Sequence, residues 1–173
     1  AAPIRRELGF RTLFNLVGPL TNPAGATHQL MGIFDGASVE KIALVLRDLG
    51  SKRALVVHGS DGLDELTISG PTSCAFLTDG AVQTFEILPT TLGIPPAPLS
   101  ELRGGDSVEN AQITRGILEG LVQGPKRDVV LLNAAAALLV AEKVENWNDG
   151  IQLAEAVIND GSALHKLDHL IRW

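Results

Sequence analysis

The sequence predicts an α/β fold with a mostly parallel central sheet, flanked by helices and carrying one antiparallel hairpin. Three features of the chain support this prediction. Residues 29–58 follow the order strand, helix, strand; two strand-like runs flank Asp79-Gly80; and helical patterns dominate the C-terminal third. Strands joined through a helix run parallel, whereas strands joined by a two-residue turn run antiparallel.

The first βαβ unit is predicted from residues 29–34 (strand), 38–49 (helix) and 53–58 (strand). The helix is indicated by apolar side chains at helical spacing, namely Val39, Ile42, Leu46 and Leu49. Ser38 is expected to cap this helix and Gly50 to end it. The second strand, RALVVH, is a short apolar run bounded by turn residues, as expected of a strand that is buried on both faces.

A hairpin follows, because the strand-like runs on either side of Asp79-Gly80 meet at one of the strongest short turn signals. Residues 88–105 are rich in proline and glycine. They are either a linker between domains or a long surface loop within one domain. We expect the whole chain, residues 1–173, to form a single domain.

Four helices are predicted after this connection, over residues 106–121, 128–144, 147–159 and 162–171. The first opens with a sequence that resembles a capping box, from Asp106 to Glu109. The second is unusually rich in alanine, which permits close packing between helices.

Composition excludes several functional classes. The formal net charge of −6, without a stripe of basic residues, disfavours nucleic-acid binding, because phosphate neutralisation supplies most of that affinity. The single cysteine, Cys74, cannot form an intrachain disulfide and is typical of a reducing cytosol, so we expect a cytoplasmic protein. The longest apolar run, residues 129–141, is shorter than the roughly 20 residues of a membrane span.

The clearest candidate for metal chemistry is the acidic pair Asp64-Glu65, in the segment that follows the second predicted strand. Ligands of open parallel sheets bind beyond the carboxyl ends of the strands. Two carboxylates there suit Mg²⁺, which prefers oxygen ligands and substrate phosphates. The residues alone leave a second interpretation open, that of a solvated acidic loop.

An anion site is the second candidate. Arg5, Arg6 and Arg11 precede Gly18-Pro19-Leu20. An arginine can hold a carboxylate through two parallel hydrogen bonds, Gly18 allows close approach to the backbone, and Pro19 stiffens the segment. A basic surface segment beside an ordinary loop explains the same residues.

Histidine and asparagine residues are predicted to be structural. His58 and His28 lack an accompanying nucleophile motif, so neither is favoured as a general base. His165 and His169 share a helix face but do not match the H-E-x-x-H pattern and have no evident third ligand. Asn110 and Asn133 are expected to orient loops or helices as buried polar groups.

Four segments together resemble anthranilate phosphoribosyltransferases. They are RRELGFRTLFNLVGPLTNPA (residues 5–24), VVHGSDGLDEL (56–66), GGDSVENA (104–111) and GPKRDVVLLNAAAAL (124–138). They occur in the order and at the spacing found in the family, and the resemblance covers essentially the whole chain. It implies the C-terminal α/β domain of that family, with an architecture shared with the nucleoside phosphorylases.

The resemblance also implies an activity and a set of residues. Members transfer 5-phosphoribose from phosphoribosyl pyrophosphate to the amine of anthranilate, in tryptophan biosynthesis, with Mg²⁺ as cofactor. Arg5 matches the arginine that binds the anthranilate carboxylate, and Gly18 and Pro19 match the loop along the anthranilate path. Asp64 and Glu65 match the acidic pair that binds Mg²⁺. No side chain is expected to act as a covalent catalyst.

Two family features have no counterpart in this sequence: the N-terminal helical region and the glycine-rich loop that holds pyrophosphate. Because family homodimers form through the helical region, we expect this chain alone to lack that interface and to have negligible activity. Two alternatives stay open at this point. One is a pyrimidine-nucleoside-phosphorylase-like enzyme, and the other is a non-catalytic, nucleic-acid-binding relative.

Overall fold

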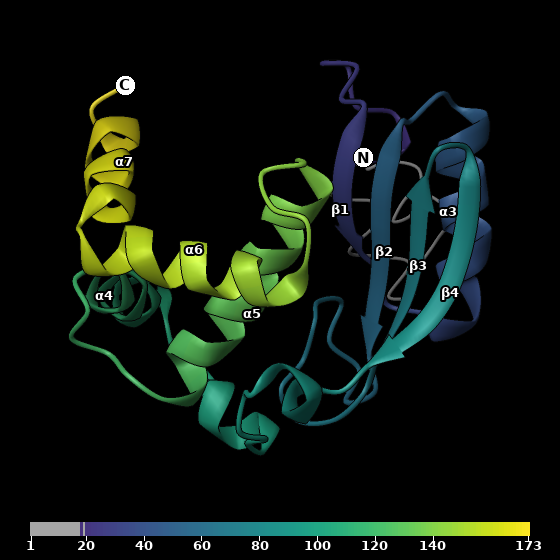
Figure 1. The fold of residues 1–173 in the computed structure, drawn as a ribbon. Coiled ribbons are helices and arrows are strands. Elements are labelled where there is room, and N and C mark those ends of the chain that lie inside the picture. The colour runs from purple at the N-terminus through teal and green to yellow at the C-terminus, as the bar shows by residue number, and fades with distance from the viewer. Residues whose placement is uncertain (1–17, 19) are drawn as a thin grey trace, which may run out of the picture.

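A four-stranded sheet in the order β1-β2-β3-β4 forms the centre of the fold (Figure 1). The computed structural model describes residue 18 and residues 20–173. The strands are β1 (His28–Gly32), β2 (Arg53–Gly59), β3 (Thr72–Thr78) and β4 (Ala81–Ile87). The predicted α/β class is confirmed, and so is the antiparallel hairpin.

The expected majority of parallel pairings is wrong for the described sheet. Only β1 and β2 are parallel, whereas β2 with β3 and β3 with β4 are antiparallel. A parallel neighbour requires a crossover, and α3 (Val39–Asp48) supplies one between β1 and β2. β2 and β3 are joined by the non-helical residues 60–71, so the chain returns in the opposite direction.

The turn of the hairpin has the conformation that its sequence predicts. Asp79 and Gly80 both have positive φ, 50° and 76°, as the central residues of a type I′ turn require. Thr78 and Ala81 are paired across this turn. Asp79 tolerates the left-handed conformation because its short polar side chain can bond locally.

Both faces of β2 are buried, as its uninterrupted apolar sequence predicts. Leu55 and Val57 belong to a core cluster that includes Leu132 of α5 (Pro125–Val140). The alternating residues Ala54 and Val56 instead pack with α3 on the opposite face. The sheet is therefore the middle of three layers, with α3 on one side and α5 on the other (Figure 1).

Further α-helices in the described part of the chain are α4 (Ser107–Leu118), α6 (Trp147–Asn159) and α7 (Ser162–Ile171). Figure 1 shows α5 nearest the sheet, with α4 and α7 farther away beyond α6. Ile117, Leu131, Ala154 and Ile158 make a core between α4, α5 and α6. Among the helices of the described residues, none is long and apolar enough to span a membrane.

Three predicted helix ends differ from the observed ones by three or four residues. α4 ends at Leu118 because Gly120 adopts a positive φ of 74°, and α5 ends at Val140 because Glu142 adopts a positive φ of 56°. α5 also begins earlier than expected, with Pro125 in its first turn. Ser38 precedes α3 without capping it, since its hydroxyl donates to Asp35 instead.

The connection over residues 88–105 is not wholly irregular. It contains two 3-10 helices, Pro89–Leu92 and Leu99–Leu102. Leu92 and Leu102 pack against the same core cluster as β2 and α5. These contacts favour the surface-loop interpretation over that of a flexible linker between domains.

Candidate functional site

The acidic pair lies on the loop that follows the carboxyl end of β2 and leads to β3. We call residues 60–71 the acidic loop. Asp64 and Glu65 are both exposed there. Within the described part of the chain, neither side chain takes part in a hydrogen bond or salt bridge. Their carboxylate oxygens are therefore available to a ligand at the edge where open parallel sheets bind ligands.

Two other carboxylates at this edge are already engaged. Asp61 accepts hydrogen bonds from the Thr67 hydroxyl at 2.5 Å and from the Leu63 N–H at 3.2 Å. Asp35, which follows β1, accepts from the Ser38 hydroxyl at 2.6 Å, and this bond is the main reason that the pKa of Asp35 is lowered. Such bonds fix the backbone of the loops and leave Asp64 and Glu65 as the free acidic groups.

On one side the acidic loop rests against the end of β1. A Cβ atom at Gly32 would lie 1.4 Å from the Asp64 carbonyl oxygen, far inside van der Waals contact. Only glycine at this position lets the loop cross the strand end so closely. Sequence reasoning missed Gly32, although an isolated glycine inside a strand pattern is a signal for close backbone approach.

On its other side the loop is bound to α5 through Asn133. The Asn133 Oδ1 accepts from the Leu66 N–H at 3.1 Å, and its Nδ2 donates to the Leu66 carbonyl at 2.9 Å. Asn133 was predicted to orient a loop, and the structure identifies the loop as the one that carries the acidic pair. Asn110, predicted to be a buried polar group, is exposed and binds both backbone groups of Gly105 instead.

The donor set is compatible with Mg²⁺ but not with a metal held by protein alone. Within the described chain, no three His, Cys, Asp or Glu side chains are close enough together to bind a metal ion. Mg²⁺ is usually bound by one or two carboxylates together with substrate phosphates and water. Asp64 and Glu65 match the protein's share of such a site.

The remaining predicted site residues are only partly described. Arg5 and Pro19 lie outside the described residues. Gly18 is exposed, and a Cβ there would meet no described atom within 4 Å. Its carbonyl accepts from the Thr21 N–H at 3.2 Å, which begins a turn before β1. The structure therefore does not test whether these residues meet the acidic pair.

The histidines have structural partners or face solvent. His58 Nδ1 lies 2.9 Å from the Ile33 carbonyl oxygen, as expected for a histidine that bonds a loop. His28 pairs with Glu142 at 3.2 Å, at the start of β1 and thus away from the acidic loop. His165 and His169 are exposed on α7.

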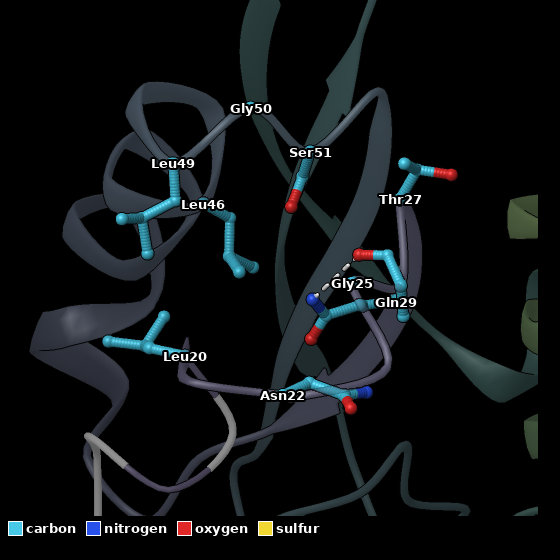
Figure 2. Close-up of a pocket in the computed structure, with 10 residues that line it drawn as sticks. Leu20, Asn22, Gly25, Thr27, Gln29, Leu46, Leu49, Gly50 and Ser51 are labelled. Carbon is cyan, nitrogen blue, oxygen red and sulfur yellow. Dashed lines mark hydrogen bonds between the residues drawn. The ribbon is translucent and has the colours of Figure 1, made fainter.

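A separate pocket of about 270 Å³ lies between the end of α3 and the start of β1 (Figure 2). Leu46 lies in α3 and Leu49 directly follows that helix. Asn22 and Thr27 precede β1, and Gln29 lies in it. None of its described lining residues has a titratable side chain. Since the pocket lies at the opposite end of β1 from Gly32, it is distinct from the acidic loop.

Comparison with known proteins gives consistent results. The family described as "Glycosyl transferase family, a/b domain" matches residues 1–164. Anthranilate phosphoribosyltransferase of Moorella thermoacetica is 51% identical over 173 residues, which are 100% of this chain and 51% of that protein. That of Symbiobacterium thermophilum is 51% identical over 169 residues, covering 98% and 49%. The chain thus spans about half the length of these curated relatives.

Solved structures of similar fold are also those of anthranilate phosphoribosyltransferases. The crystal structure of anthranilate phosphoribosyltransferase from Thermus thermophilus has a TM-score of 0.88 and 40% identity, covering 98% of this chain and 50% of that one. The Saccharomyces cerevisiae enzyme in complex with PRPP and Mg has a TM-score of 0.89 and 30% identity, covering 99% and 49%. By its match over residues 1–164, this chain belongs to the glycosyl transferase family as its α/β domain.

Proposed function

We propose that this chain is the α/β part of an anthranilate phosphoribosyltransferase, which moves 5-phosphoribose from phosphoribosyl pyrophosphate to the amine of anthranilate. The observation that carries the proposal is the pair of free carboxylates, Asp64 and Glu65, on a fixed loop beyond the carboxyl end of β2. A second support is the anthranilate phosphoribosyltransferase of Moorella thermoacetica, which is 51% identical across the whole chain.

Asp64 and Glu65 are proposed to hold Mg²⁺ on the pyrophosphate side of the site. The bound ion would offset negative charge on the departing pyrophosphate. The free oxygens of the two carboxylates are the suitable ligands, whereas the nearby Asp61 is committed to Thr67 and Leu63. The two side chains would thereby orient pyrophosphate for displacement, which is a contribution of positioning and electrostatics rather than of covalent catalysis.

Arg5 is proposed to bind the anthranilate carboxylate through two parallel hydrogen bonds, and Gly18 and Pro19 to line the path of anthranilate. This would direct the aromatic amine at C1′ of the ribose. The family's pyrophosphate-binding loop and helical dimer region are proposed to come from a preceding segment. The 173-residue chain by itself is therefore expected to have negligible activity.

Location and partners are part of the same proposal. The unpaired, buried Cys74 is compatible with a reducing compartment, and we assign the protein to the cytoplasm. The net charge of −6 supports small-molecule substrates rather than nucleic acid. The intact enzyme is proposed to be a homodimer, with the preceding helical region as the interface.

The test is substitution of the acidic pair in the full-length protein that contains this chain. Asp64→Asn and Glu65→Gln keep the shape of each side chain and remove its charge. Each is expected to lower kcat/KM for phosphoribosyl pyrophosphate on the order of 10²-fold and to raise the Mg²⁺ requirement. Asp79→Asn, at the exposed hairpin turn, is the matched control and should change neither.

Two outcomes would contradict the proposal. One is a full-length protein that consumes phosphate with a nucleoside instead of releasing pyrophosphate with anthranilate. The other is an Asp64→Asn variant whose activity and Mg²⁺ dependence equal those of the Asp79→Asn control.

A further inference from the structure

Asn133 of α5 makes two hydrogen bonds to the backbone of the acidic loop. Its carboxamide makes a bidentate contact with Leu66, accepting from the N–H at 3.1 Å and donating to the carbonyl at 2.9 Å. The second Nδ2 hydrogen donates to the Val129 carbonyl at 3.0 Å, one turn earlier in α5. Both amide hydrogens and the oxygen are thus used, so the side chain is held in one orientation.

The residue that Asn133 binds is itself fixed. Leu66 is fully buried, in the cluster that contains Leu132 and Ala136 of the same helix. Its N–H and carbonyl therefore have no access to water and depend on Asn133 as their partner. Glu65 and Asp64 are the next residues toward the N-terminus. Because one residue spans at most about 3.6 Å, the backbone of the pair cannot move far while Leu66 is held.

We propose that Asn133 is a positioning residue for the acidic pair, one that acts on bound Mg²⁺ only through the backbone of Leu66. This inference rests on the proposed function and assigns to α5 a role within the same site. Gly32 limits the loop on the β1 side, through its contact with the Asp64 carbonyl. Asn133 limits the movement of the loop on the α5 side. The backbone that carries the two carboxylates is therefore held between β1 and α5.

The chain offers a matched control for a purely structural contribution. Asn110 makes the same bidentate contact, accepting from the Gly105 N–H at 3.0 Å and donating to the Gly105 carbonyl at 3.0 Å. It joins the start of α4 to the segment before it, and neither Gly105 nor Asn110 belongs to the acidic loop. Asn110→Ala therefore removes an equivalent pair of bonds without releasing Leu66.

The experiment uses the full-length protein with the variants Asn133→Ala, Asn133→Ser and Asn110→Ala. Serine retains a hydroxyl that can donate to the Val129 carbonyl within the helix, but it is too short to bridge Leu66. If Asn133→Ala does not fold, metal binding is measured on Asn133→Ser instead. Mn²⁺ binding is followed by electron paramagnetic resonance with saturating phosphoribosyl pyrophosphate, beside a protein-free sample of the same composition. Activity assays give the half-saturating Mg²⁺ concentration and the KM for anthranilate.

Loss of a group that orients a metal ligand typically weakens metal binding by about 10- to 100-fold. We expect that loss for Mn²⁺ and Mg²⁺ in both Asn133 variants, with the KM for anthranilate changed by less than about twofold. Asn110→Ala should bind both ions like the unsubstituted protein. The inference is overturned if Asn133→Ser and Asn110→Ala have equal metal affinities, even where the Asn133 variants are less stable to heat. If the unsubstituted protein shows no metal binding with phosphoribosyl pyrophosphate, the proposed function itself fails.

Discussion

Replacement of Gly32 by alanine is the sharpest test of how the acidic loop is placed. The new Cβ would lie 1.4 Å from the Asp64 carbonyl oxygen and 2.4 Å from its carbonyl carbon. An unstrained carbon–oxygen contact is about 3.3 Å, so strand and loop must separate by about 2 Å. The neighbouring atom is backbone rather than a flexible side chain, so a rotamer change cannot relieve the overlap.

This displacement has a predictable cost for function. A misplacement of about 1 Å can lower the rate of a positioned reaction by about 10²-fold. We therefore expect Gly32→Ala in the full-length protein to reduce kcat/KM for phosphoribosyl pyrophosphate by at least about 10²-fold. Stability should also fall, by about 1–3 kcal/mol, as is usual for overpacking.

Fluorescence of anthranilate, followed at several Mg²⁺ concentrations, measures the first effect, and urea unfolding measures the second. Gly116→Ala in α4 is the matched control, because its Cβ would meet the side chain of Val122 at 2.9 Å, away from the acidic loop. It should retain activity. The reasoning is refuted if Gly32→Ala folds, retains wild-type kcat/KM and needs no more Mg²⁺ than the control.

Further predictions concern the rest of the domain. Burial raises the pKa of the Cys74 thiol to about 12, so a thiol reagent at pH 8 should label it only after unfolding; rapid labelling of the native protein would contradict this. The Arg115 hydrogen bond lowers the pKa of Asp168, so its stabilising effect should be present above the unfolded pKa and disappear as pH falls through the folded one. Urea unfolding should therefore distinguish Asp168→Asn from the unsubstituted protein at neutral pH, and the difference should shrink as the pH falls below about 3.9, the ordinary pKa of an aspartate. Arg127 is buried and bound to Glu155 at 3.2 Å, so Arg127→Ala should lower the unfolding free energy by about 2–3 kcal/mol, and a change within error would contradict this.

Much of the fold is readable from the sequence because local signals agree with the final packing. Predicted helices at residues 147–159 and 162–171 match α6 and α7 to the residue, and Gly161, with a positive φ of 80°, lies between them. The Asp79-Gly80 turn is likewise where its residue types place it. In each case a glycine at positive φ marks the boundary, and the local backbone conformation alone favours glycine there.

The missed features depend on contacts that no local pattern contains. α5 ends where Glu142 takes the left-handed conformation usual for glycine, so its sequence carries no stop signal. Glu142 is held there by distant partners, His28 and Arg53, which lie on β1 and β2. The number of parallel pairings was overestimated because the path of the chain after β2 depends on the acidic loop, not on strand composition.

In the candidate site too, local sequence signals predict some features and miss those that depend on distant contacts. The sequence identifies Asp64 and Glu65 by type and place, but it does not distinguish them from Asp61, which the structure shows bonded to Thr67. The partner of Leu66 is 67 residues away, at Asn133, a separation that periodicity cannot reveal. The roles of Arg5 and Pro19 stay predictions, since both lie outside the described residues.

The central claim is that this domain supplies one side of a site that joins phosphoribose to anthranilate. Its most direct test is anthranilate consumption and pyrophosphate release, measured with Mg²⁺ and phosphoribosyl pyrophosphate. Two samples are needed: the 173-residue chain, and the same chain joined to the preceding segment that the family resemblance implies. We predict that the longer protein releases one pyrophosphate for each anthranilate consumed and that the shorter chain releases none. Turnover by the 173-residue chain alone, or none by the longer protein, would contradict the account.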